Sequence, residues 1–415
     1  MRQVYPWWAA KNPLSERPKV KMSSNDVTVV GAGVVGAAVA YYLSEAGLSV
    51  TVLDDRPIGT ACTLHGSGQV WKMIWNDGEL YRFAMEARGV LFELVPTLWE
   101  STGIDPQLHR YDTVMPIFDD EDRVRIERDQ TTSGGDLEVR WLDRAEVLSL
   151  EPRINPEVVS GAFLAGSAQI DGYALTLALA EAARRRGARF LSLRATGIER
   201  QGGRVRALLH TGGRIPCSEV VICMGAWSNQ AAEWLGFPVP IKPLKGETVR
   251  VRPAEPFPVQ VFRPSGGGAN PRKDGLVSLG ATGTNRFNDL SGDKARIDED
   301  PLPTRAAALH MLESSQFVVP SLSQAEVVYH LAGPRPLSAD GMPIIGPVPG
   351  LAGAYLATGH RNKGIHLAPL TGRIIRDHIL HGTAESRSRL ERFLPDRFAD
   401  KESTTFNVAG VTTSA

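Results

Sequence analysis

Cysteine is scarce in this chain of 415 residues, which contains only Cys62, Cys217 and Cys223. Their number is odd and their spacing is not that of metal ligands, so the sequence predicts no metal site. Few cysteines without a pairing pattern are typical of a reducing compartment, and we expect a cytoplasmic protein. Cys223 lies in the apolar segment VVICMG, which places it in the expected core.

An excess of charge of either sign is also missing. Lys and Arg number 46 together and Asp and Glu number 46, so the formal net charge is zero. This balance argues against a nucleic-acid partner. No apolar run is long enough to be a transmembrane segment. The length exceeds what one simple core holds, so we expect two domains, interleaved or consecutive.

The most informative stretch is VTVVGAGVVGAAVAYYLSEAGLSVTVLDD at residues 27–55, which predicts a strand, a glycine turn, a helix and a second strand. Gly31, Gly33 and Gly36 have the G-x-G-x-x-G spacing. The first glycine permits a tight turn, the second lets the backbone approach a pyrophosphate, and the third lets the helix pack on the strand. The positive end of the helix favours the anion, so no lysine is required. Asp54 ends the second strand and is expected on the ribose hydroxyls.

This context predicts a dinucleotide site. The residues expected to form it are Gly31, Ala32, Gly33, Val34, Val35, Gly36, Asp54 and Asp55.

Helical periodicity recurs further along the chain, over residues 80–100, over a segment that ends at Gly187, and over residues 302–319 and 366–381. Strand-like segments lie between these helices, and the pattern of an apolar strand that ends at a glycine turn appears twice more. We therefore expect nucleotide-binding segments at 26–100, 166–235 and 332–398, with segments of a second domain at 101–165 and 236–331. Residues 1–25 are expected to be a flexible arm and residues 399–415 a disordered tail.

Six short motifs follow one another in order. They are the glycine fingerprint, GAWS at 225–228, PLKGE at 243–247, GPRP at 333–336, DGMPIIGP at 340–347 and GHRNKGIHLAPLTG at 359–372. In these motifs the chain resembles the FAD-dependent amino acid and amine oxidoreductases, which include D-amino acid oxidase, glycine oxidase and sarcosine oxidase. The resemblance covers residues 27 to about 398. It implies an α/β fold, with a Rossmann-like FAD-binding domain interleaved with an α+β substrate domain on an antiparallel sheet.

The resemblance implies that a small amino or imino acid passes hydride from its α-carbon to FAD, after which water hydrolyses the imine. D-amino acids, glycine, N-alkyl amino acids and opines are the substrates of such enzymes. The electron acceptor is oxygen or another acceptor, and a homo-oligomer or a subunit of a larger oxidase fits equally. Two alternatives stay open: an FAD-dependent dehydrogenase of a 2-hydroxy acid, and a flavoprotein subunit that relays electrons.

Three catalytic-site residues follow from the resemblance. Arg335, in G-x-R-P, would bind both oxygens of the substrate carboxylate; its alternative is an exposed arginine in a turn. Lys363 would add positive charge near the flavin N1 and C2 carbonyl; its alternative is a solvated loop lysine. Lys72 stands where a second cation on the substrate or flavin side is expected, unless its ammonium group reaches solvent.

The flavin contacts that the resemblance implies are His65, Gly66, Thr196, Gly225, Trp227, Gly359, Lys363, Gly364 and Ile365. His65 could instead cap a turn, and His360 is expected to be structural. No cysteine lies within 333–340, so FAD is expected to be held non-covalently. Gly268 and Leu331 stand where aromatic residues are frequent in the family, which predicts a roomier or differently shaped pocket.

Overall fold

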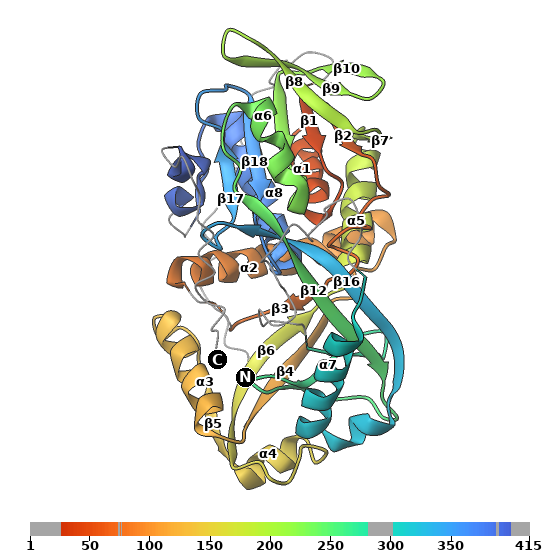
Figure 1. Ribbon diagram of the computed structural model, residues 1–415, viewed down its shortest axis with the longest axis vertical. Helices are drawn as coiled ribbons and strands as arrows, with labels where there is room; N and C mark the ends of the chain where they lie inside the picture. The colour runs from red at the N-terminus through yellow and green to blue at the C-terminus, as the bar shows by residue number, and fades with distance from the viewer. Residues whose placement is uncertain (1–25, 74, 76, 281–301, 387–389, 400–415) are drawn as a thin grey trace.

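The computed structural model describes residues 26–73, 75, 77–280, 302–386 and 390–399. Figure 1 shows two main parts, one above the other, joined by long strands. The expected arm at 1–25 and all but the first residue of the expected tail lie outside the described residues. No helix in the described part of the chain is long and apolar enough to cross a membrane.

Six of the described strands form the sheet of the upper part. Its order is β17-β18-β11-β1-β2-β7, with neighbouring strands parallel except for the antiparallel pair β17 and β18. Their bounds are β1 (Val27–Val30), β2 (Val50–Asp54), β7 (Arg189–Ser192), β11 (Glu219–Ile222), β17 (Ile344–Pro347) and β18 (Ala354–Thr358). The strand–turn–helix–strand pattern predicted for residues 27–55 is present, with β1 in the middle of the sheet.

Helices cover one face of this sheet. Alanine, valine and leucine side chains of α1 (Val34–Glu45), α2 (Gly78–Thr102), α5 (Gly172–Arg185) and α8 (Gly364–His381) share one core with β1 and β2. Helices α1 and α8 approach closely at Gly372, where a Cβ atom would lie 2.7 Å from the carbonyl group of Ala38. The final helix, expected from about His366, begins two residues earlier.

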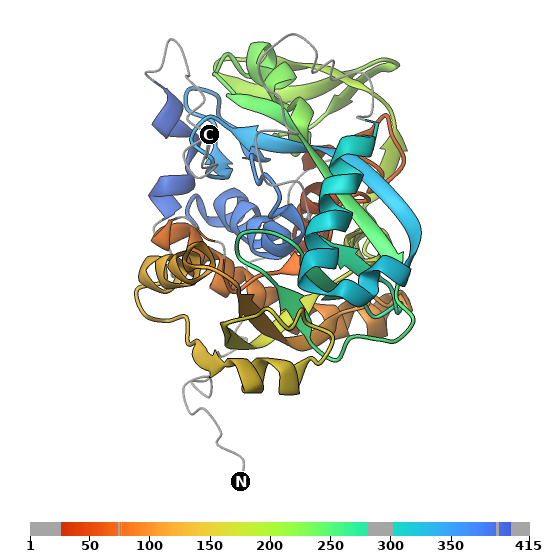
Figure 2. The ribbon, with the colours of Figure 1, turned by 60° about the horizontal axis from the view of Figure 1, so that its bottom comes forward.

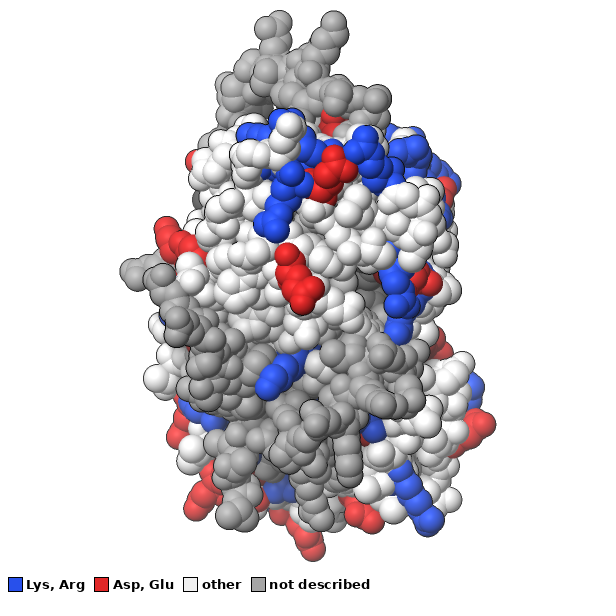
Figure 3. Space-filling view, turned by 45° about the horizontal axis from the view of Figure 1, so that its top comes forward, with Lys and Arg blue, Asp and Glu red and all other residues white. Residues whose placement is uncertain are grey.

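The opposite face carries a second core. It includes Val30 and Ile222 from the six-stranded sheet, and Val205 and Leu208 from a small antiparallel sheet. The elements on this face are β8 (Ala195–Gln201), β9 (Arg204–His210), β10 (Gly213–Pro216), the short 3-10 helix η1 (Gly225–Ala231) and α6 (Ala232–Leu235). Figure 3 shows a face of the molecule on which acidic and basic side chains are interspersed.

The lower part is built on a sheet of nine described strands, in the order β16-β12-β15-β14-β13-β4-β6-β3, with β5 pairing to β6. All its pairs are antiparallel except that of β4 with β13. The strands are β3 (Gln69–Val70), β4 (His109–Ile117), β5 (Arg140–Asp143), β6 (Ser160–Gln169), β12 (Ile241–Arg252), β13 (Gln260–Phe262), β14 (Gly268–Pro271), β15 (Val277–Leu279) and β16 (Glu326–Ser338).

Helices pack around this sheet. They are α3 (Asp120–Thr132), α4 (Arg144–Leu150), α7 (Arg305–Val318) and the 3-10 turn η3 (Pro320–Gln324). Figure 2 shows α7 beside β12 and β16. Two further 3-10 turns, η4 (Leu390–Phe393) and η5 (Pro395–Phe398), bury Phe393 and Phe398 in the upper part.

The two longest strands, β12 and β16, run from the upper part into the lower sheet (Figure 1). They pair over their whole lengths and place Gly246 opposite Gly333 and Leu244 opposite Arg335. The motifs PLKGE and GPRP, which are far apart in the sequence, therefore lie on adjacent strands. The division into domains stays a prediction; β3, from the first expected nucleotide-binding segment, pairs with β6 in the lower sheet.

The close contact between α1 and α8 generates a test of the fold. Gly372→Val should lower the free energy of unfolding by about 1–3 kcal/mol, because the added methyl groups meet the backbone of Ala38. Urea unfolding followed by circular dichroism measures this change. Gly89→Ala is the matched control, because Gly89 lies exposed in α2 with open space around it and alanine favours a helix by up to about 1 kcal/mol. Equal stability of the two variants would contradict the described packing.

Candidate functional site

A cavity of about 1000 Å³ lies between the two parts of the molecule. Its walls come from the carboxyl ends of β1, β2 and β11, the loop at residues 61–67, the inner side of β12 and β16, and the start of α8. In an open α/β sheet, ligands bind beyond the carboxyl ends of the strands. The cavity therefore joins a nucleotide-binding position to the face of the lower sheet.

The three fingerprint glycines have different surroundings. Gly31 has φ +108°, and a Cβ atom there would lie 2.3 Å from the carbonyl oxygen of Cys223. A Cβ atom on Gly36 would lie 1.9 Å from the oxygen of Gly31. At Gly33 the nearest atom is Thr63 Oγ1 at 3.6 Å, and the residue lines the cavity. Gly31 and Gly36 thus serve protein packing, whereas a side chain on Gly33 would enter the space of a ligand.

Helix α1 begins without a side-chain cap and without an acidic residue in its first turn. The amide of Val34 donates to Thr63 Oγ1 at 3.3 Å. The positive end of the helix faces the cavity, where an anion would be stabilised by the helix dipole and the first amides.

Asp54 joins the glycine turn to the second strand. Its Oδ2 accepts from the amide of Ala32 at 2.7 Å, and its Oδ1 accepts from the amide of Arg56 at 2.9 Å. Burial raises the pKa of Asp54, although these two hydrogen bonds oppose the shift. Each oxygen keeps a second lone pair for a ribose hydroxyl. Asp55 instead pairs with Arg194 at 2.6 Å.

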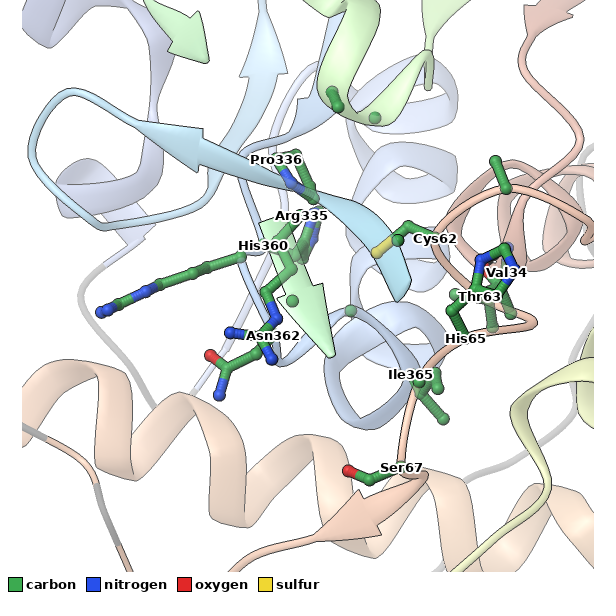
Figure 4. A pocket seen from close by; sticks show the side chains of 18 of the residues that line it. Val34, Cys62, Thr63, His65, Ser67, Arg335, Pro336, His360, Asn362 and Ile365 are labelled. Carbon is green, nitrogen blue, oxygen red and sulfur yellow. Dashed lines mark hydrogen bonds between the residues drawn. The ribbon is translucent and has the colours of Figure 1, made fainter. Parts of the chain in front are cut away.

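Two glycines, Gly246 in β12 and Gly333 in β16, make room for the side chains of Arg335 and His65. A Cβ atom on Gly246 would lie 2.1 Å from Arg335 Nε, so the guanidinium group lies across the backbone of β12. A Cβ atom on Gly333 would lie 2.9 Å from His65 Cβ. Burial lowers the pKa of Arg335 to about 10, which leaves it charged at neutral pH. Figure 4 shows Arg335 and Asn362 across the cavity from Thr63 and His65.

A buried polar network lines the lower side of the cavity. Asn270 Nδ2 donates to the carbonyl oxygen of Ser278 at 2.8 Å, so its Oδ1 accepts from Gln260 Nε2. Gln260 Oε1 accepts from Thr113 at 2.8 Å. Gln69 Oε1 accepts from Tyr111 at 3.0 Å, and its buried Nε2 has no partner among the described residues. Gln69 and Asn270 line the cavity. Sequence analysis missed this network, because its members are scattered over several strands.

The loop before α8 carries residues with different roles. Lys363 is the N-cap residue of α8, and its Nζ lies 4.4 Å from the centre of the Trp75 ring. Burial, with Arg361 nearby, lowers the pKa of Lys363 to about 7. His360 Nε2 hydrogen-bonds Thr371 Oγ1 at 3.0 Å, and burial lowers its pKa to about 3. His360 also lines the cavity, so its structural role stays a prediction.

The structure brings most of the sequence-predicted residues to the cavity. Those that line it are Gly31, Gly33, Val34, Val35, Asp54, Asp55, His65, Gly66, Gly225, Trp227, Arg335, Gly364 and Ile365. Those that do not line it are Ala32, Gly36, Lys72, Thr196, Gly359 and Lys363.

Several of the second group have other contacts. Lys72 Nζ donates to the carbonyl oxygen of Ala165 at 3.0 Å, and its neighbour Trp71 lines the cavity. Thr196 is exposed on β8, and its neighbour Ala195 lines the cavity. The amide of Ala32 is bound by Asp54, as described above.

Comparison with known proteins gives consistent matches. The family described as FAD dependent oxidoreductase (DAO) matches residues 26–378. Glycine oxidase of Geobacillus kaustophilus (strain HTA426) is 30% identical over 357 residues, which are 85% of this chain and 92% of that protein.

Two solved structures share the fold. Glycine oxidase from Geobacillus kaustophilus has a TM-score of 0.80 at 28% identity, covering 90% of this chain and 98% of that chain. Iminodiacetate oxidase from Chelativorans sp. BNC1 has a TM-score of 0.76 at 25% identity, covering 89% and 98% of the two chains.

The open space at Gly33 gives a first prediction for the site. Gly33→Leu should fold but lose affinity for the dinucleotide by at least about a hundredfold, because the side chain would occupy the phosphate position. The ratio of visible to ultraviolet absorbance of the purified protein measures its cofactor content. Recovery of fully loaded protein would contradict the role of Gly33, and Gly89→Ala serves again as the control.

The low pKa of Lys363 gives a second prediction. The pKa falls from 10.5 to about 7 on folding, so between these pH values the unfolded chain binds a proton that the folded chain does not. The free energy of unfolding should therefore rise with pH between these two values, by at most about 1.4 kcal/mol per pH unit. Below this window Lys363 should contribute nothing to the pH dependence of stability.

Urea unfolding of the cofactor-free protein at pH 7.5, 8.5 and 9.5 tests this dependence. The stability of the wild type should rise relative to that of Lys363→Met over this series. The exposed lysine variant Lys242→Met is the control and should keep the slope of the wild type. Parallel curves for the wild type and Lys363→Met would contradict the lowered pKa.

Proposed function

The chain belongs to the family of FAD dependent oxidoreductases, and from this premise we propose that it oxidises the C–N bond of a small amino or imino acid. The relatives named glycine oxidase and iminodiacetate oxidase support this substrate class. The observation that carries the proposal is a half-buried arginine, Arg335, in the same cavity as the glycine turn.

The residues of the cavity fit FAD. The start of α1, which has no acidic residue in its first turn, and the open side of Gly33 suit the pyrophosphate, and Asp54 has free lone pairs for the ribose. Gly66 is held against the start of α8, since a Cβ atom there would lie 2.7 Å from Ile365 Cδ1. We propose that FAD is held there without a covalent bond.

When bound, FAD would supply the oxidising chemistry, as the acceptor of the hydride from the substrate α-carbon while a C=N bond forms, with oxygen or another acceptor as the final oxidant. Arg335 binds both carboxylate oxygens of the substrate and so fixes the position of the α-carbon. Gly246 keeps the guanidinium group against β12, which limits the orientations it can adopt. The substrate amine releases its proton to solvent, and water hydrolyses the imine to a carbonyl acid and an amine.

The setting of the reaction is a further part of the proposal. The described cysteines, Cys62, Cys217 and Cys223, are free thiols. Burial raises the pKa of Cys62 to about 11, so this cavity-lining thiol stays protonated. We propose that the enzyme works in the cytoplasm, on the basis of its cysteine usage.

Removal of the guanidinium group tests the role of Arg335. Arg335→Ala should lower kcat/KM for the amino acid by roughly a hundredfold or more, because charge-assisted hydrogen bonds worth about 1.5–3 kcal/mol each are lost. The FAD spectrum should remain. Anaerobic reduction of bound FAD by glycine, N-methylglycine, proline and D- and L-amino acids identifies the substrate class and provides the assay.

Gly246→Val offers an independent variant of the same test. It should displace Arg335 and weaken substrate binding while the residues around the pyrophosphate are untouched. Loss of bound FAD in both variants would point to a structural role for Arg335. A flavoprotein reduced by 2-hydroxy acids and by no amine would overturn the proposed C–N oxidation.

A further inference from the structure

A second arginine lines the cavity close to Arg335. Arg361 lies in the loop before α8 and has φ +51°, a conformation that non-glycine residues rarely adopt. Its amide donates to the carbonyl oxygen of Pro336 at 2.9 Å, and His360 forms a β-bridge with Leu337. These two backbone interactions hold the loop against β16, next to Arg335. Burial lowers the pKa of Arg335, and the nearby charge of Arg361 adds to this shift.

The guanidinium group of Arg361 differs from those of Arg125 and Arg263, which also line the cavity, and Arg361 is more buried than the exposed cavity residue Arg128. Arg125 pairs with Glu121 at 2.6 Å, and Arg263 pairs with Asp119 at 2.6 Å. For Arg361, no hydrogen bond or ion pair of the side chain joins it to the described residues, and its side chain is partly buried. Burial alone lowers its pKa. A partly buried cation without a counter-ion is costly, so a ligand that brings negative charge would be favoured.

Nearby acidic groups already act on other partners. Glu247 lines the cavity but pairs with Lys245 at 3.1 Å. Asp129 also lines it, and its charge acts on Lys363, whose pKa it raises against the larger effect of burial. Asp54 accepts two backbone amides, as described above. A substrate with one carboxylate would compensate one guanidinium group and leave the other without a counter-charge.

We propose that the substrate carries a second carboxylate, which Arg361 binds while Arg335 binds the first. This inference rests on the proposed function and narrows it to amino or imino acids with two acidic groups, such as iminodicarboxylates. Gln69 and Asn270 line the same cavity and add polar groups to its wall, which suits a hydrophilic substrate. The reaction itself is unchanged, because the second carboxylate takes no part in bond breaking.

N-methylglycine and iminodiacetate form a matched pair of substrates, since they share the secondary amine and differ by one carboxylate. The wild type should have the higher kcat/KM for iminodiacetate. In Arg361→Gln the ratio of the two kcat/KM values should fall at least about tenfold, and Arg361→Lys should recover part of it. Arg125→Gln removes a paired positive charge from the same cavity and should keep the ratio of the wild type.

A binding measurement complements the kinetics. Titration of the holoenzyme with succinate and with propionate, followed by the FAD absorbance spectrum, compares ligands with two carboxylates and one. Succinate should bind more tightly to the wild type, and Arg361→Gln should remove the difference. This comparison within the wild type holds even if Arg361→Gln fails to fold, in which case Arg361→Lys supplies the variant.

Three outcomes would overturn the inference. In the first, the ratio of kcat/KM for iminodiacetate to kcat/KM for N-methylglycine stays the same in Arg361→Gln. In the second, this ratio falls equally in Arg125→Gln. In the third, Arg361→Gln loses FAD but the remaining holoenzyme keeps the ratio of the wild type. If amines reduce FAD but the wild type does not prefer the dicarboxylate, only this inference fails. If no amine reduces FAD, the proposed function fails with it.

Discussion

The pairing of β12 with β16 is the constraint on which the site depends. These strands connect the six-stranded sheet to the nine-stranded sheet, and their register sets Gly246 opposite Gly333. The absence of a side chain at Gly246 leaves room for Arg335, and its absence at Gly333 leaves room for His65. The glycine turn and Arg335 line one cavity, so the residues proposed to bind the nucleotide and the arginine proposed to bind the substrate face the same space.

Sequence patterns predicted the nucleotide half well because its signals are local. The strand, turn and helix that hold Gly31, Gly33 and Gly36 are contiguous, so spacing alone fixes their geometry. Residues predicted from single positions fared differently. Lys72 and Thr196 do not line the cavity, whereas their neighbours Trp71 and Ala195 do.

At Thr196, in β8, the reason is that successive side chains of a strand point in opposite directions, so an offset of one residue reverses the side that is reached. Lys363 illustrates the same limit at a helix start, because its position in the motif did not reveal that its ammonium group lies over Trp75. The network of Gln69, Gln260 and Asn270 depends on strand order, which no local pattern contains. Arg361 was quoted within a motif, but its charge could not be weighed before its surroundings were known.

The register of β12 and β16 also bears on how the chain can change during evolution. An insertion or deletion of one residue in β12 ahead of Gly246 would put a side chain where this glycine now stands. The same change in β16 ahead of Gly333 would replace that glycine and turn Arg335 to the other face of the sheet. Length changes outside the strands leave that alignment intact. Variation in loop length is therefore compatible with an unchanged arginine, and new substrate preferences can arise in the loops while the strand pair keeps its spacing.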